Sequence, residues 1–174
     1  HVAAMCRSCF FQLRQLRTIR SSLTTDAAKT LAQAFVGGRL DYSNSLLYGV
    51  SGELLRRLQS VQNAAARFIT GTRKYDHITP VLHSLHWLPV RQRIIFKIAT
   101  LMYRCLNGLA PSYLAADCTV VSAIPGRRQL RSATSGQLYI PRTRTVTFGP
   151  RSFKVCGPTI WNDLPARMKD QSLS

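Results

Sequence analysis

The turn on which the fold depends is HITPVLHSLHWLPV, residues 77–90. Its two prolines, Pro80 and Pro89, each stand where a helix can begin, because proline at the first helical position gives up only an N–H group that has no intrahelical acceptor. Thr79 is placed to cap the first of these helices. Between the prolines lie four large apolar residues whose burial is favourable: Leu82, Leu85, Trp87 and Leu88. The pattern predicts an elbow between two long helices.

An amphipathic helix is predicted on each side of this elbow. Upstream, residues 51–71 begin with Ser51 as the N-cap and end with Gly71, the usual residue just past a helix. The apolar stripe of that helix is Leu54, Leu58, Val61, Ala65 and Phe68. Downstream, the helix that follows Pro89 stops at Asn107-Gly108. Its predicted buried face is Ile94, Ile98, Leu101 and Cys105.

Two further helices are predicted before residue 51. Residues 2–20 combine a basic face with an apolar stripe made of Val2, Cys6, Cys9, Leu13 and Leu16. Thr24 or Thr25 caps the next helix, with Asp26 near its positive end. That helix reaches Gly37-Gly38, and two interpretations fit the sequence. The glycine pair either ends the helix, or lets a neighbour pack closely against a helix that continues through residues 39–49.

The composition changes towards the C-terminus, where residues 124–154 carry arginine and lysine but no acidic residue. Residues 138–140 and 143–148 have the composition of two short strands; the alternative is a disordered basic tail. Residues 155–165, VCGPTIWNDLP, carry the apolar side chains of a terminal docking helix: Ile160, Trp161 and Leu164.

These patterns predict a mainly α fold, a multi-helix bundle. The predicted domains are a helical domain over residues 1–118 and a basic C-terminal extension over residues 119–174. The extension is expected to hold a short β-hairpin or an irregular segment, followed by the docking helix.

The net charge indicates the class of partner. The 174 residues include 24 Lys and Arg against 7 Asp and Glu, a formal net charge of +17. Most of the cations are arginine, whose planar guanidinium matches phosphate. Such a chain repels itself unless a polyanion is near, so nucleic acid is the predicted partner. The other interpretations are a ribosome-type accessory protein and a fragment of a better balanced chain. The apolar helix after Pro89 contains four cations, so no membrane partner is predicted.

Residue patterns for catalysis or metal binding are sparse. A polymerase or nuclease needs clustered carboxylates to hold two metal ions, whereas the acidic residues here occur singly. Cys6-x-x-Cys9 and His83-x-x-His86 have the spacing of zinc ligands, but the cysteines fall on an apolar helical stripe, where buried thiols are common. No catalytic residue and no metal site are therefore predicted. The five cysteines are expected to be free thiols in a reducing compartment.

Several motifs, in their order along the chain, carry a family resemblance. They are FVGGRLDYSNSLLYG (35–49), LLRRLQSVQNAAARFITG (54–71), HITPVLHSLHWLPVRQRIIFKI (77–98), NGLAPSYL (107–114) and RSFKVCGPTIWNDLP (151–165). Together they resemble the C-terminal part of the reverse transcriptases of non-LTR retrotransposons, the LINE elements, of the jockey-like kind. The likeness covers nearly the whole chain, and none of these motifs is catalytic.

The resemblance implies that the chain is the helical thumb, with the segment after it, of an RNA-directed DNA polymerase. The parent reverse transcriptase is a nucleotidyltransferase whose two-metal aspartates, with their Mg²⁺, belong to a palm upstream of this chain. No cofactor and no activity are expected in the chain alone. The implied partners are RNA and DNA, as an RNA–DNA duplex held by its backbone, and the palm. The implied location is the nucleus and cytoplasm.

The alternative function is a stand-alone basic fragment of a decayed or domesticated element, binding nucleic acid or protein without enzymatic activity. Under either interpretation the expected contacts are arginines outside the apolar stripes, since phosphate contacts position a nucleic acid without reading its sequence. The predicted contact set is Arg14, Arg17, Arg56, Arg57, Arg91, Arg93, Arg127, Arg128, Arg142 and Arg144.

Overall fold

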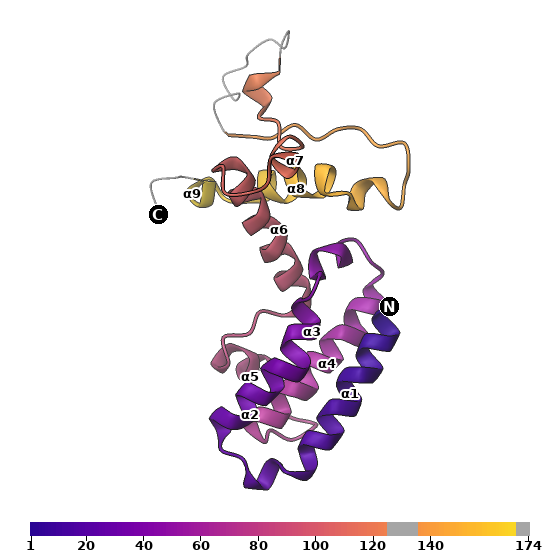
Figure 1. Cartoon of the computed structure of the whole chain (residues 1–174), viewed down its shortest axis with the longest axis vertical. Coiled ribbons are helices and arrows are strands. Elements are labelled where there is room, and N and C mark those ends of the chain that lie inside the picture. Colours follow the sequence, from indigo (N-terminus) through magenta and orange to yellow (C-terminus); the bar gives the residue numbers. More distant parts are fainter. Residues whose placement is uncertain (125–135, 170–174) are drawn as a thin grey trace. The chain divides into compact units, whose positions relative to one another are not determined.

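The computed structural model of the chain is mainly helical, as predicted, and describes residues 1–124 and 136–169 (Figure 1). The chain divides into two compact units, His1–Ile94 and Ile95–Ser174. The division falls inside α6 (Val90–Leu106), whereas the boundary predicted between residues 118 and 119 lies within the second unit. Among the described helices, none is long and apolar enough to cross a membrane.

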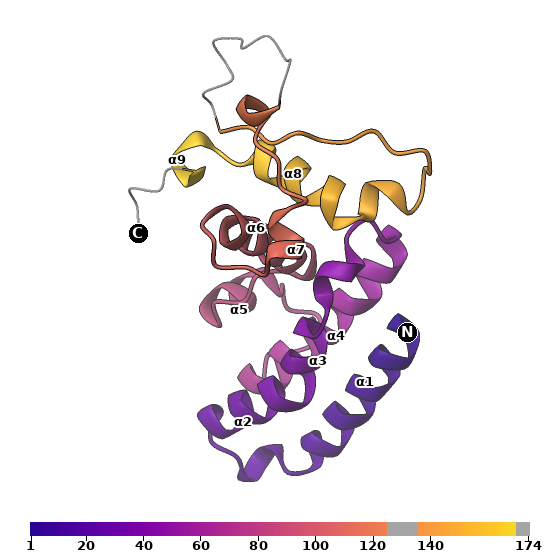
Figure 2. The ribbon, with the colours of Figure 1, turned by 45° about the horizontal axis from the view of Figure 1, so that its top comes forward.

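The first unit is a bundle in which α1, α2 and α4 lie side by side (Figures 1 and 2). Its helices are α1 (Val2–Thr18), α2 (Thr25–Ala32), α3 (Gly38–Asp41), α4 (Gly52–Thr70) and α5 (Thr79–Ser84). The stripe predicted for the first helix is buried in full, and Leu58, Val61, Ala65 and Phe68 are buried on α4. Short 3₁₀ turns over η1 (Arg20–Ser22) and η3 (Asn44–Leu47) join the helices.

The second helix runs through its glycine pair. Thr24 caps α2, its hydroxyl accepting the Ala27 N–H at 3.2 Å. A π-helical turn, η2 (Gln33–Gly37), connects α2 to α3. Gly37 is buried, and a Cβ there would collide with the Gln33 side chain of the preceding turn. The glycine pair therefore does not end the helix, but the helix stops at Asp41, short of the predicted continuation through residue 49.

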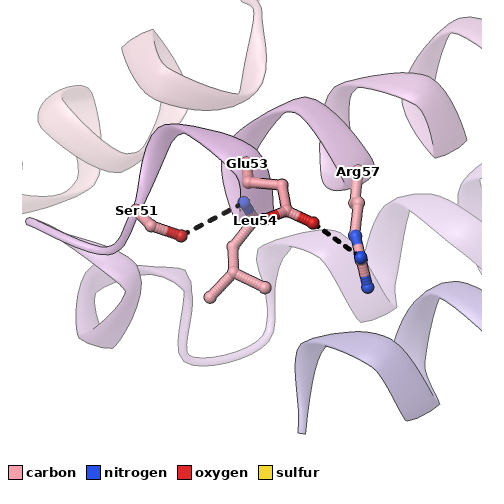
Figure 3. A network of polar contacts seen from close by, with 4 residues as sticks. All are labelled: Ser51, Glu53, Leu54 and Arg57. Atoms are coloured by element: carbon pink, nitrogen blue, oxygen red, sulfur yellow. Dashed lines mark hydrogen bonds and ion pairs between the residues drawn. The ribbon is translucent and has the colours of Figure 1, made fainter.

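Both predicted ends of α4 are confirmed. The Ser51 hydroxyl accepts the Leu54 N–H at 3.5 Å, and Glu53 pairs with Arg57 one turn later at 2.6 Å (Figure 3). At the other end Gly71 takes the left-handed conformation, with φ at 73°, and its N–H bonds to the Arg67 carbonyl. A side chain is strained in that conformation, which explains glycine there.

The elbow is made of a short helix and a turn held by amides from α4. Ile78 precedes α5, so Thr79 is the first helical residue and not the cap that its position predicted. Gln62, fully buried, donates from Nε2 to the Leu88 carbonyl at 2.8 Å. Gln59 accepts the Val90 N–H at 2.9 Å, which satisfies a free donor at the start of α6. Two glutamines of α4 therefore set where α6 begins.

The second unit combines the rest of α6 with α7 (Ser112–Ala115), α8 (Phe153–Asp163) and α9 (Ala166–Lys169). On α6 the buried face contains Met102 in place of the predicted Leu101, which is half-buried. Gly157 of α8 lies directly against the Met102 side chain, where a Cβ would clash. Single 3₁₀ turns occur at η4 (Val121–Ala123) and η6 (Gly149–Arg151).

The hairpin predicted over residues 138–140 and 143–148 does not form. Leu138 instead makes an isolated bridge with Val120, and residues 143–148 contain no strand. The Asn162 side chain of α8 bonds Leu138 twice, donating to its carbonyl and accepting its N–H, each at 2.9 Å. Trp161 donates from Nε1 to the Gly136 carbonyl at 3.3 Å. The segment at residue 138 is thus paired by a helix side chain where a second strand was expected.

All five cysteines are free thiols, and burial has a consequence for alkaline stability. Burial first, then the neighbouring Cys105 thiol and Asp117, raise the pKa of Cys118 from its ordinary 9.0 to about 12. The folded chain therefore keeps this proton where the unfolded chain releases it. Below pH 9 the Cys118 thiol does not change the free energy of unfolding of the second unit. As the pH rises from 9 towards 12, it lowers that free energy progressively.

We expect Cys118→Ala to reduce this alkaline loss of stability. The measurement is urea unfolding at pH 8 and pH 10.5, followed by Trp161 fluorescence in a chain carrying Trp87→Phe, since the sequence has two tryptophans. If the free energy of unfolding falls by the same amount from pH 8 to pH 10.5 in the parent and in Cys118→Ala, the raised pKa of Cys118 is contradicted.

Candidate nucleic-acid interface

A basic hollow surface of the first unit lies between α1 and α4. Two adjoining hollows of about 670 and 400 Å³ share Phe10 of α1 and Ser60 of α4 as lining residues. One pairs Arg7 with Arg57, and the other contains Arg17 and Arg67, so α1 and α4 run in the same direction along them. We call the two hollows together the α1–α4 groove.

Helical spacing explains how each wall is built. On α4 the lining residues Arg57, Ser60, Ala64 and Arg67 recur every three or four positions, which places them on one face, with Phe68 and the C-cap Gly71 at its end. On α1 the lining residues are Ala3, Cys6, Arg7, Phe10 and Arg17. Ser60, Ala64 and Gly71 are small, so the floor of the groove stays open between longer side chains. No lining residue is acidic.

Two of the lining arginines have structural partners. Arg20 donates to the carbonyls of Phe68 and Ile69 in the last turn of α4, at 2.8 and 2.7 Å, and to that of Leu23 at 3.0 Å. Its guanidinium also lies 5.9 Å from the centroid of the Phe68 ring. Arg67 donates to the carbonyls of Arg73 and Asp76, both at 3.2 Å, and so holds the loop after α4. These cations add charge to the groove while most of their donors are occupied.

Other cations keep their donors for a ligand. Arg7 and Arg17 are exposed and bond to none of the described residues. Lys74 is exposed too, and its ammonium lies 5.8 Å from the centroid of the Tyr75 ring. Arg57 is engaged by Glu53, but half of its side chain is exposed. Side chains that are free to donate hydrogen bonds to phosphate therefore occur at both ends of the groove, and Phe10 lies between them.

The predicted contact residues of the first unit fall into three groups. The groove brings together Arg17 and Arg57. Exposed arginines of the first unit that do not line it are Arg14, Arg56 and Arg91. Arg93 differs, because it is largely buried and forms an ion pair with Asp41 at 2.8 Å. Its guanidinium joins the first turn of α6 to the end of α3, which makes it a structural residue first.

The rest of the predicted set belongs to the second unit. Arg142 and Arg144 are exposed on the extended segment that precedes η6. Lys154, which is not in the predicted set, pairs with Asp117 at 3.4 Å. Arg127 and Arg128 lie outside the described residues. The C-terminal part of the chain therefore presents exposed arginines on an extended segment.

Sequence reasoning missed four cations of the α1–α4 groove: Arg7, Arg20, Arg67 and Lys74. The helical spacing of Arg57 and Arg67 with Ser60 and Ala64 could have indicated a shared face on α4. No comparable signal existed for Arg20, whose two acceptors on α4 are 48 and 49 residues away in the sequence. That pairing depends on how α1 packs against α4.

The groove also contains the thiol of Cys6, which is in its neutral, less reactive form. Burial raises the pKa of Cys6, against a smaller opposing effect of the Arg57 charge, so the neutral thiol prevails at pH 7. His83 and His86, its partners in the zinc pattern weighed above, are exposed on the elbow. In residues 1–124 and 136–169 no group of three or more metal-ligating side chains occurs.

The chain was compared with protein-family models, with curated proteins and with solved structures, and none of the three comparisons gives a match.

Proposed function

We propose that this chain is the thumb and C-terminal extension of the reverse transcriptase of a non-LTR retrotransposon. In this role it grips the backbone of the template–primer duplex, without reading sequence. The ordered motifs of the sequence support the assignment. Bond formation, and the Mg²⁺ it requires, belong to the palm of the parent protein, which works in the nucleus and cytoplasm.

The fold gives the non-catalytic motifs a structural explanation. Gln59 and Gln62, in the motif LLRRLQSVQNAAARFITG, hold the elbow through its backbone. Trp161 and Asn162, in the motif ending WNDLP, hold the segment at residue 138. These residues have a role in packing and none in chemistry, which suits a region that positions nucleic acid for a separate catalytic centre.

One observation supports the binding mode most strongly: apart from Arg57, the cations of the α1–α4 groove form no ion pair with a described acidic residue. Within the described part of the chain only three ion pairs form, and Arg57 is the one groove residue among them. The cations that remain repel one another across the groove. A row of phosphates removes this repulsion and releases its own counterions, which favours binding at low salt.

The expected result is a steep salt dependence of binding to an RNA–DNA hybrid. For each phosphate neutralised, log affinity should fall by about 0.7 to 0.9 per unit of log salt concentration. Fluorescence anisotropy with a labelled hybrid duplex between 50 and 300 mM KCl measures the slope. An affinity that is flat over this range would refute the backbone grip.

The polymerase assignment has its own test in the gene. We expect the reading frame that encodes this chain to continue upstream into a palm with an Asp-Asp pair. An upstream frame that encodes an unrelated domain would reject the reverse transcriptase, while leaving nucleic-acid binding to be decided by the salt titration.

A further inference from the structure

We propose that the α1–α4 groove is a site for a single strand of nucleic acid, with one base stacked on Phe10 and phosphates at Arg7 and Arg17. The inference deepens the proposed function and rests on it for the class of ligand. It adds that the nucleic acid in the groove is single-stranded and that a base contacts Phe10, neither of which is required for a grip on duplex backbone.

The position of Phe10 carries the argument. Phe10 belongs to both hollows, yet 41% of its surface is exposed, so it lines the groove without being buried in the core. It lies one turn after Arg7 and two turns before Arg17 on α1. An aromatic ring between two phosphate donors is the arrangement that binds one strand, because every base has a face to stack.

The dimensions of the groove agree with a short strand. Ten residues separate Arg7 from Arg17, which is about 15 Å along the helix axis. At the ~3.4 Å rise of stacked bases this length accommodates roughly four nucleotides. Lys74 and the engaged Arg20 and Arg67 extend the positive surface beyond Arg17. A strand that enters beside Arg7 therefore meets positive charge along the whole groove.

A duplex cannot use Phe10 in this way. Paired bases are stacked on one another and offer only their edges in the grooves, so a protein ring finds a free base face only on an unpaired strand or at an end. An acidic peptide would satisfy the cations but gives Phe10 no flat partner. The combination of ring and cations therefore favours a single strand over both.

The chain supplies controls for the contacts of Phe10 and Arg17. Phe11 is more exposed than Phe10, at 57%, and lies on the same helix outside the groove. Lys29 of α2 is an exposed cation of the first unit that lines neither hollow. The variants are Phe10→Ala with Phe11→Ala as its control, and Arg17→Gln with Lys29→Gln as its control. Phe10→Leu keeps the apolar bulk, and Phe10→Tyr keeps the ring.

Anisotropy with labelled oligo(dT), oligo(U) and hybrid duplex measures the effect in the whole chain. We expect Phe10→Ala and Phe10→Leu to weaken both single strands about tenfold and the duplex less than twofold, with Phe10→Tyr and Phe11→Ala close to the parent. Arg17→Gln should lower the salt slope for single strands by about 0.7, and Lys29→Gln should not. An oligonucleotide carrying 5-iodouracil should cross-link to Phe10, located by mass spectrometry.

The outcomes separate this inference from the proposed function. Salt-dependent binding of duplex, with single strands insensitive to Phe10, overturns the groove site alone. If polyglutamate displaces oligo(dT) at the same concentration of negative charge, the single-strand site is also overturned, in favour of an acidic protein partner. A chain that binds neither strand nor duplex at 50 mM salt defeats both. Circular dichroism that is unchanged in Phe10→Ala and Phe10→Leu excludes unfolding as the cause of a loss.

Discussion

Arg20→Ala is expected to lower the free energy of unfolding of the first unit by about 3 kcal/mol, since hydrogen bonds from a charged donor contribute about 1.5–3 kcal/mol each and some of these are part-exposed. The substitution removes three bonds to the carbonyls of Phe68, Ile69 and Leu23. Two of these acceptors are in the last turn of α4, where unpaired carbonyls make the helix end negative. Arg20 thus stabilises the end of one helix from the end of another.

Hydrogen exchange of the buried amides in α1 and α4 measures the change within the first unit. Arg20→Lys keeps the charge but has a single ammonium for three carbonyls, so an intermediate loss is expected. Arg17→Ala is the matched control, because Arg17 is exposed and bonds to no described residue; its effect should stay within about 0.5 kcal/mol. Equal exchange in Arg20→Ala and Arg17→Ala would show that the carbonyl bonds add nothing to stability.

Asn162→Leu is expected to destabilise the second unit by about 2–4 kcal/mol, because both backbone groups of Leu138 lose their partner while they remain buried. Leu138 is 2% exposed, and its N–H and carbonyl both bond to the Asn162 amide. A buried peptide group without a hydrogen bond carries its full cost of desolvation.

Urea unfolding followed by Trp161 fluorescence, again with Trp87→Phe, measures this loss. Asp163→Ala changes the next residue of α8, which is exposed, and should shift the midpoint little. Asn162→Asp keeps the acceptor for the Leu138 N–H and loses the donor, so its loss should lie between the two. A midpoint in Asn162→Leu equal to that of Asp163→Ala would exclude the amide as a tie between α8 and residue 138.

The helices could be predicted because their signals are local. Ser51 and Gly71 bound α4 through bonds to groups within a few residues, and the apolar stripes follow from the period of a helix. The prediction of a hairpin was wrong because the partner of a strand is not determined locally. Residues 138–140 have strand composition, but composition does not say whether a strand or the amide of Asn162 will pair their backbone.

The candidate site was predicted less well than the fold. Exposure on a helix identifies arginines that face solvent, and Arg17 was found in this way. It does not distinguish Arg14 from Arg17, which differ in whether α4 lies beside them. It also placed Arg93 in the contact set, although Asp41, 52 residues away, engages its guanidinium.

The sequence by itself determined a mainly helical, strongly basic chain, because helical period, caps and net charge are properties of neighbouring residues or of the composition. Only the tertiary structure decided which cations are free to bind and which hold the fold. The ties of Arg20, Gln62 and Asn162 join residues 48, 26 and 24 positions apart. Such pairs exist only after packing has brought distant segments together, and the α1–α4 groove is a product of the same packing.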